Sequence, residues 1–198
     1  EIAHTNPLWI NPIEAKKIKV ETGDLVKVET EIGYFVTRAW VTEALAPNVV
    51  ACSHHMGRWR LAETQGNERW SSSVVDLVDK GEGKFLLRQK KGISPFSSSD
   101  PDSKNIWWND AGVHQNMTFP VQPDPISGMH CWHQRVVVKK ASEGEKYADV
   151  FVDTKKSHEV FKRWLEKTIP APGPDGMRRP WWLLRPLRPH PDAYKYEK

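Results

Sequence analysis

VETGDLVKVETEIGYFVTRAWV, residues 20–41, alternates apolar and polar side chains on both sides of a turn at Glu31–Gly33. Alternation with a period of two is typical of strands that bury one face, so this stretch predicts a β-hairpin. Gly23 precedes the first arm at a point where a positive φ is expected. Asp24 can then hydrogen-bond nearby backbone groups. The stretch therefore favours a mainly β fold.

A short helix is predicted before the hairpin, over residues 11–17, NPIEAKK. Asn11 is a good N-cap, Pro12 suits the first helical position, and Glu14 has the spacing of a capping box.

Two further strands are predicted from apolar runs, at NVVACSHH (48–55) and HQRVVVKKA (133–141). The second of these is expected to be buried on at least one face. A short helical turn is expected at 109–113, within WWNDAGVHQNMTF.

Residues 62–105 differ in composition, because they are rich in Ser, Gly, Lys and Asp. Apolar clusters occur there only at SVVDLV (73–78) and KFLLRQ (84–89), so the segment is interpreted as a long excursion or inserted loop. Residues 1–141, with this excursion, are predicted to form one domain.

The last part of the chain, residues 142–198, has another character. Val160, Phe161, Trp164 and Leu165 have helical spacing and predict an amphipathic helix over 157–169. Proline recurs after residue 169, which excludes a regular helix, and tryptophan is frequent, which is unlike a disordered tail. The sequence therefore predicts an amphipathic helix followed by a proline- and tryptophan-rich extended arm that lies on another surface.

Composition limits the partners. The net charge of +4, with no dense Lys/Arg block and no nucleic-acid-binding motif, predicts no nucleic acid partner. No run approaches the roughly 20 apolar residues of a membrane helix, so no direct membrane span is predicted. The start, EIAHTNPLW, lacks a signal peptide and is interpreted as a cut through a longer protein.

Both cysteines lie among histidines, in CSHH (52–55) and HCWH (130–133). These residues could supply zinc ligands, but the two-residue spacer usual between cysteine ligands is missing. In a strand, moreover, Cys52 and His54 would share one side and His55 the other. We favour no metal ligands here. The alternatives left open are a zinc-stabilised scaffold or subunit-assembly module, and a Cys52–Cys131 disulfide.

Three glycine-containing stretches at predicted strand edges suggest a binding site: HHMG (54–57), GVHQNMT (112–118) and SGMHCWHQ (127–134). Amide and imidazole groups can both donate and accept hydrogen bonds, as recognition of guanine or a pterin requires. Glycine also lets the backbone approach a ligand closely. The pattern favours a cradle for a polar heterocycle and phosphates.

The stretch from Leu8 to Gly57 resembles the opening of the C-terminal dinucleotide-binding domain of the molybdopterin oxidoreductases, the dimethyl sulfoxide reductase family. The matching order is an INP-x-x-A helix start, a GD-x-V-x-V strand, a return strand after a glycine turn, a V-x-P-x-V-V-like strand and an H-x-G element. GVHQNMTFPVQPDPISG (112–128), followed by RVVVKKA (135–141), is similar to the family's asparagine-bearing loop and closing strand.

This resemblance implies a double-psi β-barrel, here without its usual first strand, that binds bis-molybdopterin guanine dinucleotide. The molybdenum ligand and an iron–sulfur cluster are expected outside these residues, so no catalytic residue is expected here. The cofactor-binding residues that the matched motifs imply are His4, Asn11, His54, His55, Gly57, Asn116, Thr118 and Gln134.

The function implied is that of the cofactor-binding C-terminal part of a molybdenum oxidoreductase catalytic subunit, inactive on its own. It would position the cofactor for two-electron redox chemistry of a sulfur oxyanion or related compound. The sequence looks most like sulfite dehydrogenases and polysulfide or thiosulfate reductases, with arsenic-oxyanion enzymes as the alternative within the family. Expected partners are the remainder of the catalytic subunit, an iron–sulfur electron-transfer subunit and a membrane quinone-reactive subunit. The complex would be membrane-associated, with the cytoplasmic face favoured over the periplasm.

Overall fold

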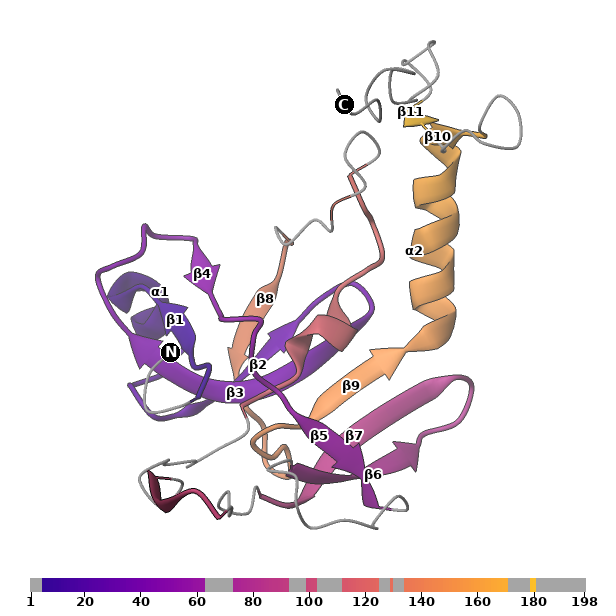
Figure 1. Ribbon diagram of the computed structural model, residues 1–198. Coiled ribbons are helices and arrows are strands. Elements are labelled where there is room, and N and C mark those ends of the chain that lie inside the picture. The colour runs from indigo at the N-terminus through magenta and orange to yellow at the C-terminus, as the bar shows by residue number, and fades with distance from the viewer. Residues whose placement is uncertain are drawn as a thin grey trace, which may run out of the picture. The chain divides into compact units, whose positions relative to one another are not determined.

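The structure is a computed structural model that describes residues 5–62, 73–92, 99–102, 112–124, 129, 134–170 and 179–180. The described part is mainly β, as the sequence predicts (Figure 1). The chain divides into two compact units, Glu1–Phe119 with Arg135–Lys155, and Pro120–Gln134 with Lys156–Lys198.

The first unit is built on a mixed sheet in the order β4-β1-β3-β9-β7-β6-β5, with β2 pairing with both β3 and β8. Two of the pairings, β1 with β3 and β5 with β6, are parallel. Among the described strands, the two at the ends of this order, β4 and β5, do not pair with each other. The expected barrel is therefore not closed by hydrogen bonds within the described residues. The strands are β1 Leu8–Ile10, β2 Leu25–Glu29, β3 Gly33–Val41, β4 Val50–Ala51, β5 Trp59–Leu61, β6 Ser73–Asp79, β7 Lys84–Lys91, β8 Val137–Lys140 and β9 Val150–Asp153.

The hairpin predicted from residues 20–41 is confirmed as β2 and β3, which pair from Leu25↔Arg38 to Glu29↔Tyr34. Its alternating apolar side chains supply the centre of the core, together with residues of β1, β7 and β9. Gly23 has a φ of +99°, and the Asp24 carboxylate accepts a hydrogen bond from the backbone N–H of Glu21, both as expected.

The predicted short helix is α1, Pro12–Lys17. The Asn11 side-chain oxygen accepts from the backbone N–H of Ile13 at 2.9 Å, so the predicted N-cap is confirmed. Glu14 forms an ion pair with Lys17 at 2.9 Å. This pairing lies within the helix, whereas a capping box would direct Glu14 back to the N-cap.

The segment interpreted as an excursion contains a hairpin that belongs to the main sheet. β6 pairs antiparallel with β7, and β7 pairs antiparallel with β9. The two apolar clusters that stood out in this polar segment supply its buried side chains, Val74, Val75, Leu86 and Leu87. Residues 73–79 and 84–91 are therefore sheet and not loop.

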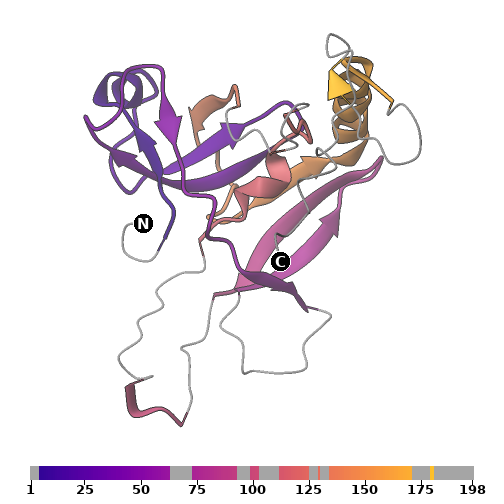
Figure 2. The same ribbon diagram turned by 45° about the horizontal axis from the view of Figure 1, so that its top comes forward.

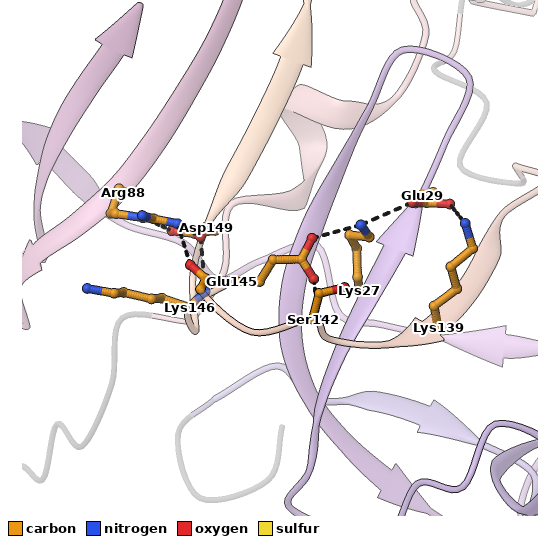
Figure 3. A network of polar contacts seen from close by, with 9 residues as sticks. Lys27, Glu29, Arg88, Lys139, Ser142, Glu145, Lys146 and Asp149 are labelled. Atoms are coloured by element: carbon orange, nitrogen blue, oxygen red, sulfur yellow. Dashed lines mark hydrogen bonds and ion pairs between the residues drawn. The ribbon is translucent and has the colours of Figure 1, made fainter. Parts of the chain in front are cut away.

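An ion-pair network fixes the connection between β8 and β9 to this hairpin (Figure 3). Asp149 is fully buried, and Arg88 of β7 donates to its carboxylate oxygens at 2.9 and 2.5 Å. The Asp149 carboxylate raises the pKa of Arg88 above its usual value. Nearby, Lys27 lies between Glu29 and Glu145.

Three other predicted elements differ in extent. The strand expected at 48–55 forms only β4, and the strand expected at 133–141 forms β8, where Val138 alone is half-buried and the other three residues are exposed. One face is partly buried, because Val136 and Val138 pack against the core whereas Val137 between them is exposed, so the prediction of a buried face is confirmed in part. The helical turn expected at 109–113 lies partly outside the described residues. A 3₁₀ turn, η3, instead occupies Gln115–Thr118.

The amphipathic helix is confirmed as α2, Thr154–Glu166, which begins three residues before the predicted start. Val160 is buried, and the Trp164 indole N–H donates to the backbone oxygen of Pro123 at 2.9 Å. β10, Thr168–Ile169, pairs with β11, Arg179–Pro180, and the rest of the predicted arm lies outside the described residues. No helix in the described ranges is long and apolar enough to cross a membrane.

Candidate functional site

Two loops that are far apart in the sequence meet beside β1 in the first unit. The first, residues 52–57, follows β4, and the second, residues 112–118, ends in η3. Val113 of the second loop is fully buried in the core, and η3 lies beside β3 and β9 (Figure 2). These loops carry two of the three glycine-containing stretches selected from the sequence.

Asn6, just before β1, joins the two loops through its side-chain amide. Its oxygen accepts from the backbone N–H of Val113 at 2.7 Å, and its nitrogen lies 2.9 Å from the backbone oxygen of Val113. The same nitrogen donates to the backbone oxygen of Ser53 at 2.9 Å and to Gln115 Oε1 at 2.8 Å. Because Asn6 is only 1% exposed, these contacts replace hydrogen bonds to water.

Gln115 completes the connection from the second loop. Its side-chain nitrogen donates to the backbone oxygens of Ser53 and Cys52 at 2.7 and 3.3 Å. Thr118, at the end of η3, donates through its hydroxyl to the backbone oxygen of Gln115, and its own backbone oxygen accepts from the Thr30 hydroxyl. The second loop is thus fixed to the first loop and to the turn of the β2–β3 hairpin.

Two glycines permit this close approach. Gly57 has a φ of +99°, and a Cβ atom there would lie 2.3 Å from His114 Cα. Gly112 has a φ of +71°, and a Cβ atom there would lie 2.6 Å from Asn6 Oδ1. Side chains at these positions would combine left-handed backbone strain with overlap of fixed atoms.

Asn116 offers the clearest ligand-binding group. Its side-chain nitrogen donates to the backbone oxygen of His54 at 3.3 Å. Its side-chain oxygen is buried and has no hydrogen-bond partner in the described part of the chain. Buried acceptors are normally satisfied, so this oxygen marks a point where a donor is missing.

The joined loops also carry three imidazole rings, those of His54, His55 and His114. The rings of His54 and His55 lie 4.0 Å apart, and His55 Nδ1 is 3.4 Å from the Ser53 hydroxyl. His114 is half-buried and meets the edge of Trp59, with ring centroids 6.1 Å apart. Burial lowers the pKa of His114, which keeps this imidazole neutral at neutral pH.

The zinc alternative finds no support in the first Cys–His cluster. Burial raises the pKa of Cys52 to about 12, and its thiol donates to the backbone oxygen of Asn6, so the thiolate that zinc needs is disfavoured. Among the residues whose placement is known, no group of three or more His, Cys, Asp or Glu side chains could hold a metal ion. The second cluster, His130, Cys131 and His133, lies outside the described residues.

The strand argument applied to CSHH is wrong. β4 ends at Ala51, so the alternation of faces does not extend to the histidines. The rings of His54 and His55 therefore lie against each other, tilted by 33°, instead of pointing to opposite sides.

The predicted binding residues have different positions. His54, His55, Gly57, Asn116 and Thr118 lie in the two joined loops, although the Thr118 hydroxyl is used within η3. Their role in binding stays a prediction.

The remaining three predicted residues are not part of the joined loops. Asn11 uses both ends of its amide in the fold, for the α1 cap and for the backbone oxygen of Leu45 at 2.7 Å. Gln134 belongs to the second unit, and His4 lies outside the described residues.

A surface hollow of about 720 Å³ lies elsewhere, between α1 and the turn before β2. It is an open depression whose Lys140 and Asp24 side chains pair with each other. A much smaller space of about 20 Å³ lies next to the loops, lined by Gly57, Gly112 and His114, and has room for about one water molecule. We place the site at the loops, because the unsatisfied acceptor lies there.

Comparison with known proteins gives a consistent result. Residues 1–82 match the family described as the molydopterin dinucleotide binding domain. Dimethyl sulfoxide reductase DmsA of Escherichia coli is 28% identical over 99 residues, which are 50% of this chain and 10% of the relative. The probable dimethyl sulfoxide reductase chain YnfF of the same organism is 30% identical over 99 residues, 50% of this chain and 11% of the relative. No solved structure matches.

The chain thus spans about a tenth of the length of these curated relatives. The matched family binds a molybdopterin dinucleotide, which agrees with the cofactor predicted from the sequence. The residues of the joined loops fit this group, because they combine glycines at close approach, amide and imidazole groups, and an acceptor that has no donor among the described residues.

Proposed function

We propose, since residues 1–82 belong to the molydopterin dinucleotide-binding domain of the dimethyl sulfoxide reductase family, that the two joined loops hold part of a bis-molybdopterin guanine dinucleotide cofactor. The chain is then the cofactor-positioning part of a molybdenum oxidoreductase. The cofactor supplies the redox chemistry, and these residues bind and orient it.

The observation that carries the proposal is the unsatisfied Asn116 oxygen. The orientation of this amide is determined by chemistry, because its other end faces the carbonyl of His54, which can only accept. An acceptor left buried without a donor costs on the order of 1–3 kcal/mol. Guanine and pterin rings both carry N–H donors that would remove this cost. Because the oxygen is buried, the atoms that cover it must move aside to admit the ring, while the two loops stay joined.

The other residues have supporting roles in the proposal. Gly57 and Gly112 allow the loops to pack tightly, so the positions of the surrounding groups are defined before the ligand arrives. The neutral imidazole of His114 and the rings of His54 and His55 provide polar edges and flat faces. Such groups suit a neutral heterocycle.

The substrate of the whole protein is proposed to be a sulfur compound, most specifically a sulfur oxyanion. The support is that both relatives are named for dimethyl sulfoxide, a sulfur compound. The molybdenum ligand is assigned to residues outside this sequence. An iron–sulfur electron-transfer subunit and a quinone-reactive membrane subunit are proposed as partners of the whole protein.

Mass spectrometry of pterin released from the full-length purified complex tests the proposal. Guanine dinucleotide is expected, and a preparation that is active yet yields none would overturn the assignment. Asn116→Ala is expected to lower molybdenum content per polypeptide. Asn48→Gly, which removes an exposed amide outside the loops at a φ of +63° that glycine adopts easily, is the control and should leave the content unchanged. Full molybdenum content in Asn116→Ala would remove Asn116 from the site.

A further inference from the structure

We propose that Asn6 and Gln115 are positioning residues, whose paired amides join the loops 52–57 and 112–118 and so determine which end of Asn116 faces the ligand. Neither residue was among the predicted cofactor-binding residues, although Gln115 lies in the stretch 112–118 selected from the sequence. The inference rests on the proposed function only for the identity of the ligand. The positioning itself is argued from hydrogen bonds within the chain.

The orientation of Asn6 is not ambiguous, although amide oxygen and nitrogen atoms often are. One end of its amide faces the backbone N–H of Val113, which can only donate. The other end faces the backbone oxygens of Val113 and Ser53, which can only accept. The oxygen of Asn6 must therefore face the N–H, and its nitrogen must face the two carbonyls.

This orientation determines that of Gln115. The Asn6 nitrogen also contacts the Gln115 side chain at 2.8 Å, so the atom it meets must be the oxygen. The Gln115 nitrogen then faces the backbone oxygens of Ser53 and Cys52, as a donor should. Each contact agrees with the next, which is the condition for a buried polar network to be rigid.

The network ends at the ligand-facing residue. Ser53 is held by both amides, and His54 follows it in the chain, so the network fixes the carbonyl that Asn116 contacts. Asn116 is in turn the neighbour of Gln115. Its amide is therefore held from both loops, with the nitrogen on His54 and the oxygen left for a ligand.

Burial makes this arrangement hard to replace. Asn6 is 1% exposed and Gln115 is 2% exposed, so water is not available to take over lost contacts. Gln115→Met keeps the length of the side chain but removes its donor and its acceptor. The carbonyl of Ser53 then loses one of its two amide donors, and the first loop is no longer tied to the second loop through Gln115.

The first test uses nuclear magnetic resonance on the full-length protein, prepared without cofactor and with its asparagine side chains labelled with ¹⁵N. In Gln115→Met, the Asn116 side-chain N–H₂ signals are expected to move toward the positions of a free amide. Val26→Ala, a cavity variant in the buried part of β2, is the control for general loosening and should leave these signals in place. Unchanged Asn116 signals in Gln115→Met, or an equal movement in Val26→Ala, would overturn the positioning role.

A second measurement needs no variant, which matters if Gln115→Met does not fold. In the wild-type chain, the backbone N–H of Val113 donates to Asn6. It should be among the slowly exchanging amides in deuterated water, because the contact is buried and rigid. Rapid exchange of this N–H would overturn the proposal.

Binding of guanosine diphosphate, used as a probe, separates the two proposals. Its dissociation constant is expected to rise about tenfold in Gln115→Met, as for the loss of one buried hydrogen bond, and to stay unchanged in Val26→Ala. An equal rise in both variants would contradict positioning. If the wild-type chain binds no probe, the proposed nucleotide site is contradicted, and the Asn116 signals alone decide the positioning role.

Discussion

The guanidinium of Arg88 holds both carboxylate oxygens of Asp149, a side chain with no exposed surface. Arg88 lies in β7 and Asp149 directly precedes β9, so the pair fixes the added hairpin to the sheet that carries the site. Asp149 also accepts from the backbone N–H of Lys146. A buried carboxylate depends on such partners, because an isolated buried charge is strongly unfavourable.

Arg88→Met is expected to lower the free energy of unfolding by about 3 kcal/mol, because it leaves the buried Asp149 without its cation. We take the lower end of the usual range since Arg88 itself is one-third exposed. Urea denaturation measures the change. Lys84→Met, which removes an exposed pair with Glu82, is the control and should change stability by less than about 1 kcal/mol. Similar losses in both variants would contradict the importance of burial.

Gly57→Ala is expected to destabilise the protein by more than Gly81→Ala. Both glycines have a positive φ, which costs on the order of 1–3 kcal/mol for another residue. At Gly81 the new methyl group meets nothing within 4 Å, whereas at Gly57 it overlaps the backbone of His114. Thermal unfolding of the two variants compares the costs. Equal melting temperatures would show that the loops are not in contact at Gly57.

The Cys52 thiol should be unreactive toward iodoacetamide in the folded protein at pH 8, since burial raises its pKa to about 12. Denaturant should restore reactivity, and peptide mapping by mass spectrometry identifies Cys52 separately from Cys131. Rapid labelling of Cys52 without denaturant would contradict its burial.

The same raised pKa predicts a dependence of stability on pH. The folded state binds the thiol proton more tightly than the unfolded state, whose thiol has a pKa near 9.0. This contribution is fully present below pH 9 and is lost as the pH rises toward 12. Cys52→Ala should reduce the fall in stability over this range, as measured by urea denaturation at several pH values. An unchanged slope would contradict the shift.

Asn11→Ala is expected to lower the free energy of unfolding by about 1–2 kcal/mol, since the N-cap of α1 and the contact with Leu45 are both lost. Asn11→Asp keeps the capping oxygen and should recover part of this loss. Neither change should alter binding of the nucleotide probe if Asn11 acts only in the fold. Weakened binding in a stable Asn11→Asp variant would return Asn11 to the site.

The sequence predicts well those elements whose information is local. The β2–β3 hairpin follows from alternation across a glycine turn, α1 from its capping residues, and α2 from helical spacing at Val160, Phe161, Trp164 and Leu165. In each case the pattern lies within the element itself, so a single sequence is enough.

The sequence does not predict how the elements pair. The apolar clusters at 73–78 and 84–89 were visible, but their place beside β9 depends on contacts between distant segments. The joining role of Asn6 and Gln115 could not be predicted for the same reason, since a single buried amide has no periodic pattern in the sequence. Their only signal was indirect: Gln115 falls in a glycine-containing stretch next to Asn116.

The position of β9 has a consequence for biosynthesis. β9 is hydrogen-bonded to β3 on one side and to β7 on the other, although it follows both in the chain. The two hairpins can each form early, because their contacts are local, but they share no completed sheet until residues 150–153 have left the ribosome. Until then, the backbone groups of β3 and β7 that pair with β9 have no partner strand. Unpaired strand edges promote aggregation, so the nascent chain is most prone to aggregate during this interval.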